Sequence, residues 1–326
     1  MKRRSLLLTM GTVPLVAIFA SARCLGQPST VRRRVAILTV SPEASFAGSL
    51  KVFRDGLREN GLVEGQDVVI DVRYGNGRTQ VLPRLAAELA ALGPSVIIAL
   101  GAAATDAALA TGGEVPIVSL GDLIARGHAA DLGRPGSRVT GISFLPTPLN
   151  VKRLELLAEL LPKGSAILNL ADLRPIPGAM QVVEDAGRSL GVVTHAAYAN
   201  TPAEIESAFL TARKLRVAGI NVFNSPFLSA ESARIIRLAA DTRLPAIYQW
   251  PETAREGGLI GYGPRITAMF RQLADYASRI LNGAKPAELP IEQPKRFELC
   301  INLKTAKALG LAIPQSLLLR ADEVIR

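Results

Sequence analysis

Cysteine and histidine are scarce in this chain of 326 residues, which contains only two of each. Cys24 lies near the start of the sequence and Cys300 lies in an apolar run, so neither a disulfide framework nor a cysteine-based metal cluster is indicated. His128 lies in a Gly-rich loop and His195 inside an apparent strand, and ordinary structural positions are favoured for both over a metal or catalytic pair. We therefore predict no metal site and no cofactor.

Sequence signatures of catalysis are also missing. The chain has no Gly-x-Ser-x-Gly nucleophile elbow, and no phosphate loop accompanies Lys163-Gly164-Ser165. No dinucleotide-binding fingerprint follows the first apolar run, residues 35–40. No catalytic residue is predicted, and an α/β enzyme is the less favoured interpretation.

Aromatic residues make up only 5% of the chain, although its formal net charge is +10. A basic cluster such as the three arginines at residues 32–34 can bind nucleic acid or acidic lipid. The small number of aromatic residues and the lack of a nucleic-acid-binding motif favour instead a solvated basic leader over residues 23–33. We predict no nucleic-acid partner.

The first 22 residues have the organisation of a secretory signal peptide. Residues 2–4 are basic, residues 5–20 are mostly apolar, and residues 20–22 form a small-x-small cleavage site. The apolar run is shorter than a membrane-spanning helix requires. An arginine directly before Cys24 departs from a lipobox, so lipidation is not expected. Residues 3–7 also resemble a loose twin-arginine signal, so the Sec and twin-arginine routes both stay open for a protein predicted to be periplasmic.

Strand-like and helix-like patterns alternate from residue 34 onward. This alternation predicts the α/β class, with parallel sheets and right-handed crossovers. A length of 326 residues is sufficient for two lobes. The predicted strands are residues 35–40, 68–74, 96–100, 115–118 and 139–143 in the first half of the chain, and 166–170, 192–198, 220–223 and 246–248 in the second.

Residues 95–122 contain two of these strands and a short alanine-rich helix between them. In such a unit the strand ends and the amino end of the helix face one crevice, where open α/β sheets bind ligands. The amides of Ala103, Ala104 and Thr105 are predicted to be free to donate to an anion or carboxylate. The alternative is a tight strand-to-helix turn whose small residues serve packing.

Two further strand ends contribute side chains to the predicted crevice. Ser41 follows the first strand, and Asp122 follows the strand of residues 115–118. Asp122 is predicted either to orient a ligand ammonium or to cap its own loop.

Polar and aromatic residues also follow the strands of the second half. The crevice rule places the ends of residues 220–223 and 246–248 opposite the strand ends of the first half. The aromatic residues there form either a wall for a ring or cation, or packing at a hinge. The predicted ligand-binding residues on this side are Asn224, Ser225, Tyr248, Gln249, Trp250 and Tyr262.

Long motifs in the chain resemble those of one protein family. GGLIGYGP at residues 257–264 is followed by RILNGAKPAELP at 279–290, and EQPKRFEL at 292–299 is followed by INLKTAKALGL at 301–311. With FRDGLRENG at 53–61, these motifs resemble the ABC transporter substrate-binding protein family that includes tryptophan- and tyrosine-type uptake receptors. The likeness spans nearly the whole predicted mature chain.

The resemblance implies two Rossmann-like lobes of the type I periplasmic-binding-protein architecture, joined by a hinge of several strands. Residues 34–143 with 264–288 are predicted to form the first lobe, and 144–263 with 289–326 the second. The chain departs from the family at the cleft, where GAAAT stands in place of a Gly-Thr-Pro-Ala-like turn and Asn-Ser-Pro in place of a later Pro-Asp-like turn. These departures allow a ligand different from that of the better-known relatives.

The resemblance further implies an exported, monomeric solute-binding protein without a catalytic role. Such a protein captures a small organic solute, here amino-acid-like with aromatic amino acids among the candidates, and delivers it to an ABC permease at the membrane. A ligand-sensing domain of a signalling system on the same fold is the alternative. An N-terminal helix-turn-helix would favour that alternative, and the signal-peptide pattern occupies its place.

Overall fold

The computed structural model describes residues 32–144, 146–172 and 178–326. The predicted signal peptide at residues 1–22 and most of the predicted leader, with Cys24, lie outside the described residues. Residues 32–326 contain two sheets, and the predicted two-lobed α/β class is confirmed. We call the part built on the five-stranded sheet the first lobe and the part built on the seven-stranded sheet the second lobe.

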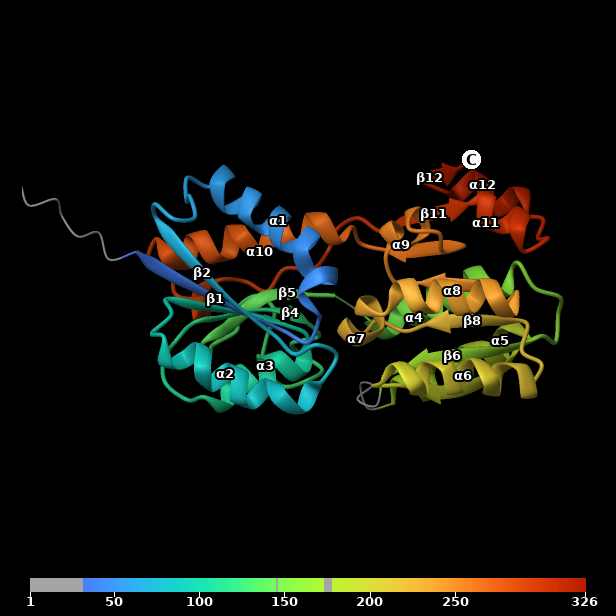
Figure 1. The fold of residues 1–326 in the computed structure, drawn as a ribbon, viewed down its shortest axis with the longest axis horizontal. Helices are drawn as coiled ribbons and strands as arrows, with labels where there is room; N and C mark the ends of the chain where they lie inside the picture. The colour runs from blue at the N-terminus through green and yellow to red at the C-terminus, as the bar shows by residue number, and fades with distance from the viewer. Residues whose placement is uncertain (1–31, 145, 173–177) are drawn as a thin grey trace, which may run out of the picture. The chain divides into compact units, whose positions relative to one another are not determined.

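The first lobe is built on a parallel sheet in the order β2-β1-β3-β4-β5. Its strands β3 and β4 are buried along their whole length because helices cover both faces of the sheet. Figure 1 shows α1 and α10 on one face, and α2 and α3 on the other. The strands are β1 (Arg33–Thr39), β2 (Val68–Tyr74), β3 (Val96–Leu100), β4 (Ile117–Gly121) and β5 (Val139–Ser143), and the helices are α1 (Glu43–Glu59), η1 (Thr79–Val81), α2 (Leu82–Ala91), α3 (Ala102–Ala110) and α10 (Ile266–Leu281).

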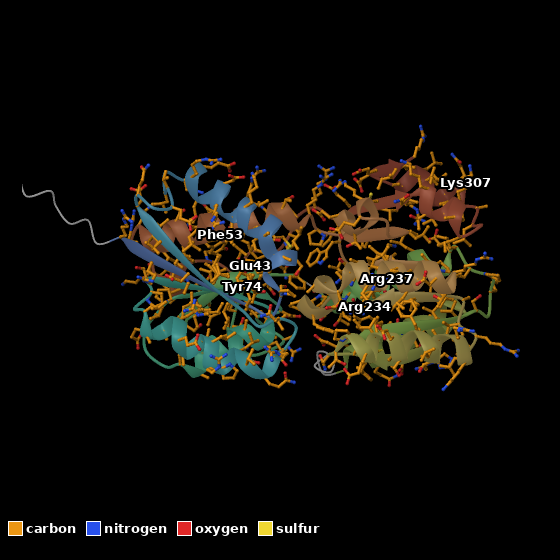
Figure 2. The ribbon with its side chains drawn as sticks, in the orientation of Figure 1. Glu43, Phe53, Tyr74, Arg234, Arg237 and Lys307 are labelled. Atoms are coloured by element: carbon orange, nitrogen blue, oxygen red, sulfur yellow. The ribbon has the colours of Figure 1, made fainter. Side chains whose placement is uncertain are left out.

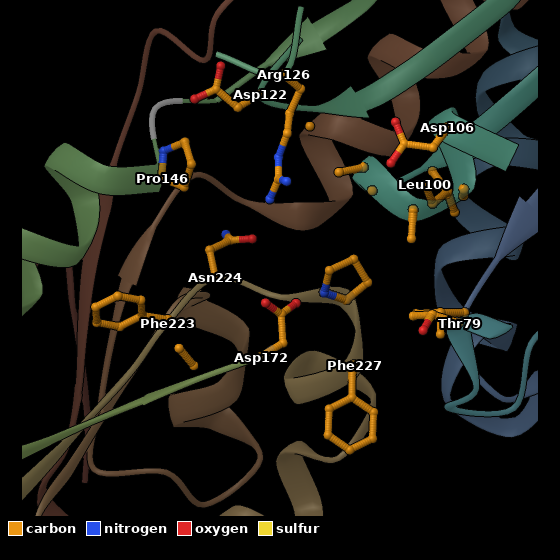
Figure 3. A pocket seen from close by; sticks show the side chains of 18 of the residues that line it. Thr79, Leu100, Asp106, Asp122, Arg126, Pro146, Asp172, Phe223, Asn224 and Phe227 are labelled. Atoms are coloured by element: carbon orange, nitrogen blue, oxygen red, sulfur yellow. The ribbon is translucent and has the colours of Figure 1, made fainter. Parts of the chain in front are cut away.

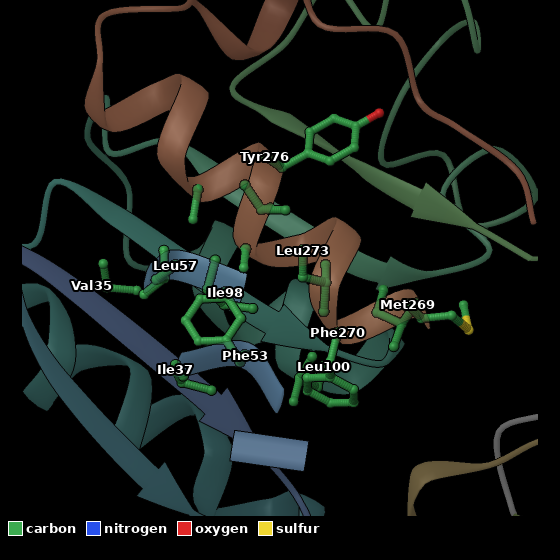
Figure 4. Close-up of a cluster of buried hydrophobic side chains, with 14 of the residues drawn as sticks. Val35, Ile37, Phe53, Leu57, Ile98, Leu100, Met269, Phe270, Leu273 and Tyr276 are labelled. Atoms are coloured by element: carbon green, nitrogen blue, oxygen red, sulfur yellow. The ribbon is translucent and has the colours of Figure 1, made fainter. Parts of the chain in front are cut away.

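The core of this lobe joins segments far apart in the sequence. Phe53 and Leu57 of α1 pack with Ile98 of β3 and Leu273 of α10 in one buried cluster (Figure 4). The two helices approach closely at Gly56, where an added Cβ would lie 2.8 Å from the Cβ of Ala274. The C-terminal half of the chain therefore supplies one of the two helices, α10, that cover this face of the first lobe.

The second lobe is built on a sheet in the order β12-β11-β10-β9-β8-β6-β7. Its paired strands are parallel except β10 and β11, which are antiparallel. The strands are β6 (Ala166–Ala171), β7 (Val193–Tyr198), β8 (Gly219–Val222), β9 (Ala246–Tyr248), β10 (Ile260–Gly263), β11 (Glu298–Asn302) and β12 (Glu323–Ile325). The helices are α4 (Pro146–Ala158), α5 (Ala179–Leu190), α6 (Pro202–Lys214), α7 (Pro226–Ala230), α8 (Ser232–Thr242), α9 (Pro251–Arg255), α11 (Leu303–Ala308) and α12 (Gln315–Arg320), and η2 (Pro286–Glu288) is a short 3-10 helix between the lobes in sequence.

Side chains alternate between the two faces of this second sheet. Leu168 and Ile220 pack with α6, α7 and α8, whereas Ile167 and Ile247 pack with α4 and α5. Exposed helix positions carry charge, as Arg237 of α8 and Lys307 of α11 do in Figure 2. Both faces of the second sheet are thus covered, and its parallel strands end at one edge.

The start of α6 is specified locally. The Thr201 hydroxyl accepts a hydrogen bond from the Glu204 amide at 3.2 Å, and the Glu204 carboxylate accepts one from the Thr201 amide at 3.0 Å. This reciprocal cap, followed by Pro202, confirms the predicted helix start. A further backbone hydrogen bond from Asn200 is the main cause that lowers the pKa of Glu204.

The segment after η2 is hydrogen-bonded to the first lobe. The Thr140 hydroxyl donates to the Leu289 carbonyl at 2.8 Å, and the Glu292 amide donates to the Gly141 carbonyl at 3.0 Å. The chain joins the second sheet only at Glu298. The lobe ranges remain a prediction, and this pairing favours a final crossing between residues 292 and 298.

No described helix combines the length and the apolar character that crossing a bilayer requires.

Candidate functional site

A pocket of about 310 Å³ lies where strand ends of both lobes converge (Figure 3). This volume suits a small organic molecule. Both lobes contribute polar and apolar groups to it. Its lining is Val40, Thr79, Gln80, Leu82, Leu100, Gly101, Ala102, Ala103, Ala104, Asp106, Gly121, Asp122, Arg126, Phe144, Pro146, Thr147, Asn150, Ala171, Asp172, Ala179, Asn200, Phe223, Asn224, Pro226 and Phe227.

The amino end of α3 forms one side of the pocket. Gly101 links β3 to α3 with φ of 89° and ψ of 164°, a conformation that only glycine adopts readily. Ala103 and Ala104 lie in the first turn, where amides have no acceptor within the helix. The prediction that the Thr105 amide is free was wrong, because it donates to the Gly101 carbonyl at 3.0 Å as the helix closes its first turn.

The loop after β4 carries charged groups on the same side. Asp122 and Arg126 both line the pocket, and in Figure 3 Arg126 extends toward its centre. Asp122 Oδ1 accepts a hydrogen bond from the Ala125 amide at 3.1 Å, which is the predicted loop-capping role. His128 anchors the loop to α3, since its Nε2 lies 2.6 Å from Asp106 Oδ1. The loop is therefore held by its own aspartate, Asp122, and by the contact of His128 with Asp106 of α3.

The second lobe lines the opposite side with residues that directly follow its strands. Asp172 follows β6, Asn200 follows β7, and Asn224 follows β8. Figure 3 shows Asp172 and Asn224 directed into the pocket. Asn224 Nδ2 is a buried amide nitrogen without a hydrogen-bond partner among the described residues. Carboxylate and amide groups can here bind a cation or a polar ligand group.

A buried polar network lies next to this side. Asn150 of α4 lines the pocket, and its Oδ1 accepts hydrogen bonds from Arg153 Nη2 and, at 3.4 Å, from the backbone amide of Asn224. Asn221 Nδ2 donates to the Asn150 carbonyl and to Asn169 Oδ1, both at 3.1 Å. Arg153 is fully buried, and desolvation lowers its pKa to about 9, so it stays protonated at neutral pH.

Seven predicted site residues do not line the pocket, and three of them, Ser41, Thr105 and Ser225, are small residues that use polar groups within the fold. The Ser41 amide donates to Thr39 Oγ1, and the Ser225 hydroxyl caps α7 by accepting from the Leu228 amide at 3.3 Å. The Thr105 hydroxyl is buried, donates to the Gly101 carbonyl and lies 2.7 Å from Ser119 Oγ. A role for these residues in ligand binding remains a prediction.

The aromatic residues predicted to form a wall, Tyr248, Trp250 and Tyr262, do not line the pocket. Trp250 is 8% exposed, packs edge-to-face with Phe144 at 6.2 Å, and donates from Nε1 to Ser229 Oγ at 2.9 Å. Gln249 donates to the same hydroxyl at 2.8 Å. Tyr248 belongs to the core between β9 and α8, where burial raises the pKa of its phenol.

Tyr262 has its partners outside the pocket as well. Its ring stacks on Phe297 with centroids 6.5 Å apart, and its carbonyl accepts from Arg153 Nη1 at 3.1 Å. The rings that line the pocket are Phe144, Phe223 and Phe227. The aromatic character predicted for the site is thus supplied by phenylalanines.

A family model described as ABC transporter substrate binding protein matches residues 34–325. The chain belongs to this family. The match covers nearly all of the described chain, including every strand that contributes to the pocket from β3 to β8.

Solved structures share the fold of this family member. A conserved domain protein from Vibrio cholerae O1 biovar El Tor strain N16961 has a TM-score of 0.81 at 22% identity, covering 90% of this chain and 99% of that one. An ABC domain from Streptococcus pneumoniae in complex with L-Trp has a TM-score of 0.80 at 23% identity, covering 90% and 100%. The ligand-free, open structure of CD0873, a substrate-binding protein with adhesive properties from Clostridium difficile, has a TM-score of 0.61 at 19% identity, covering 90% and 99%. No curated protein sequence matches the chain.

The sequence reasoning missed several lining residues of this substrate-binding protein. Asp172 and Asn200 could have been found by the same strand-end rule that identified Asn224, because each follows a predicted strand within two residues. Arg126 and Phe227 lie in a loop and in a short helix, and neither has a periodic signal. Arg153, which lies next to the pocket lining, also has no signal in the sequence. A basic residue on a helix is usually exposed, and only the structure shows that this position of α4 is buried.

Proposed function

We propose that this substrate-binding protein captures a small amino-acid-like solute between its two lobes and delivers it to an ABC permease. It acts as an exported, monomeric, non-enzymatic protein of the periplasm. The observation that supports this best is the mixed charge of the pocket. Arg126 and the first-turn amides of α3 lie together with Asp122 and Asp172 around one space of about 310 Å³. An amino acid is a zwitterion, so its carboxylate can pair with the positive groups and its ammonium with the aspartates.

The ligand carboxylate is assigned to the amino end of α3. The Ala103 and Ala104 amides and the positive end of the helix dipole favour an anion there, and Arg126 adds a full positive charge nearby. The ligand ammonium is assigned to Asp122 or Asp172. An aromatic or apolar ligand side chain is supported by Phe144, Phe223 and Phe227, and by the L-Trp complex of the pneumococcal structure.

A thermal-shift screen of the purified protein against the common L-amino acids and small carboxylates, with sugars and polyamines as comparison ligands, tests this proposal. At least one amino acid is expected to raise the unfolding temperature in a dose-dependent way, with calorimetry giving one site per chain. A screen in which sugars or polyamines stabilise the protein, and amino acids do not, would contradict the ligand class while leaving the family unaffected.

A further inference from the structure

Arg153 is a buried cation without a carboxylate partner. The residue is 0% exposed, and within the part of the chain that the structure describes no aspartate or glutamate forms an ion pair with it. Its guanidinium donates to two neutral acceptors, the Tyr262 carbonyl and Asn150 Oδ1, and its buried Nε has no partner. Desolvation of an unpaired charge is costly, so a guanidinium in this position calls for a counter-charge.

The contacts of Arg153 lead directly to the pocket. Asn150 is 3% exposed and lines the pocket, and its Oδ1 already accepts from Arg153 Nη2 and from the backbone amide of Asn224. The carboxamide therefore has only its Nδ2 left to offer the pocket. Asn224, the next pocket-lining residue, has a buried Nδ2 without a partner. The second-lobe side thus has two side-chain amide donors, of which Asn150 Nδ2 is held by the contacts of its own Oδ1, next to one buried positive charge.

These donors lie close to the amino end of α3 on the opposite side. An added Cβ at Gly101 would lie 2.6 Å from Cγ of Pro226, so the loop after β3 contacts the loop after β8 at this point. Ala103 and Asn224 are each two residues from that contact. A carboxylate has two oxygens that accept from several donors, and it can bridge the two sides here.

We propose that Arg153 is a positioning residue for the ligand carboxylate. It orients Asn150, whose Oδ1 also accepts from the backbone amide of Asn224, so that the Nδ2 groups of Asn150 and Asn224 donate to the carboxylate from the second lobe. The charge of Arg153 is offset only when that anion is bound. This inference rests on the proposed function and adds a second-lobe anchor, with preference for a carboxylate over a neutral amide. The competing interpretation is that Arg153 only ties α4 to β10 through the Tyr262 carbonyl.

The test measures discrimination between a carboxylate and its neutral isostere. Wild type, Arg153→Met and Arg153→Lys are titrated by calorimetry with each L-amino acid that binds and with its C-terminal amide. Acetate and acetamide serve as probes that need no identified ligand, with thermal shifts read against chloride at equal ionic strength. Lys152→Met is the matched control, because it removes a half-exposed cation that pairs with Glu155 on the same helix.

Arg153→Met is expected to weaken binding of the carboxylate form by about 10- to 100-fold while changing binding of the amide by less than about threefold. Arg153→Lys retains the charge and is expected to retain most of the discrimination, and Lys152→Met all of it. Equal losses for the carboxylate and the amide, or no loss, would overturn the proposal. Far-ultraviolet circular dichroism reports whether each variant is folded.

Asn224→Leu keeps the proposal testable if Arg153→Met does not fold. It removes the unpartnered donor without changing Arg153, and the same loss of discrimination is expected. If no amino acid binds the wild type, the proposal of an amino-acid ligand fails. The thermal shifts with acetate and acetamide then test the positioning role of Arg153 independently of that proposal. Acetate shifts that are equal in wild type and Asn224→Leu would then reject the positioning role.

Discussion

Gly101 lies against the ring of Pro226, so that the loop after β3 in the first lobe and the start of α7 in the second lobe are in direct contact. A Cβ on Gly101 would approach Pro226 Cγ to 2.6 Å, and the backbone at Gly101 has a positive φ of 89°. Because both residues line the pocket, the two lobes are in contact at the wall of the space in which we place the ligand.

Gly101→Ala is therefore expected to weaken ligand binding by at least about tenfold, since the added methyl group prevents this approach. Backbone strain adds a loss of about 1–3 kcal/mol in unfolding free energy. Gly112→Ala is the matched control, because Gly112 also has a positive φ, of 71°, but nothing within 4 Å of its added Cβ. Similar affinities of the two variants, measured by calorimetry, would show that the contact does not matter for binding.

Two substitutions of Asp122 distinguish a role of its charge in ligand binding from its role in capping the loop. Asp122→Asn keeps an oxygen for the Ala125 amide and removes the charge, whereas Asp122→Ala removes both. If Asp122 binds the ligand ammonium, both variants should lose about 1–3 kcal/mol of binding free energy. Calorimetry that finds wild-type affinity for Asp122→Asn and a loss only for Asp122→Ala would assign Asp122 to its loop alone.

The single tryptophan is a reporter of the pocket from behind its lining. Trp250 packs on Phe144, which lines the pocket, so binding should change the intensity or wavelength of emission excited at 295 nm. Trp250→Phe is expected to abolish the signal and to leave affinity within about twofold, because the indole itself does not line the pocket. A saturating ligand that leaves wild-type emission unchanged would separate Trp250 from the site.

Glu252 links the start of α9 to the start of α10 and makes stability depend on pH. Its carboxylate accepts from the Ile266 amide at 3.1 Å, its second oxygen is buried without a partner, and desolvation raises its pKa above the ordinary 4.5. A raised folded-state pKa gives a contribution to stability that is present below pH 4.5 and lost as pH rises through the folded value. Glu252→Gln should therefore gain stability relative to wild type on going from pH 4 to pH 7.5.

Chemical unfolding at both pH values measures this difference. Glu288→Gln, at an exposed carboxylate, is the control and should show no such gain. An equal effect of Glu252→Gln at both pH values would mean that the carboxyl group is solvated in the folded protein.

Much of the fold follows from local patterns. The runs that became β3 and β4 are continuous and apolar because both faces of the sheet are covered, and Leu50, Phe53 and Leu57 already mark the buried side of α1. The C-terminal strands were not predicted from periodicity. β12 is three half-buried residues long, and the antiparallel direction of β11 depends on its tertiary partner β10.

The sequence predicted which chain segments form the site better than it predicted which side chains point into it. The strand-end rule placed Ala103, Ala104, Asp122 and Asn224 in the crevice, and all four line the pocket. The rule does not say where a side chain points. Trp250 follows β9 as expected, yet its indole contacts Ser229 and Phe144. The smaller ring of Phe144 lines the pocket in its place.

Calorimetry on two variants in which an alanine of α3 is replaced by phenylalanine tests most directly whether this pocket is the ligand site. Ala103→Phe fills the space at the amino end of the helix, and Ala110→Phe adds the same ring at its exposed far end. With the amino acid that gives the largest thermal shift, we expect Ala103→Phe to weaken binding by about 100-fold or more, since the ring occupies the volume of the ligand, and Ala110→Phe to bind as wild type does. Wild-type affinity in a folded Ala103→Phe variant would contradict this location of the site.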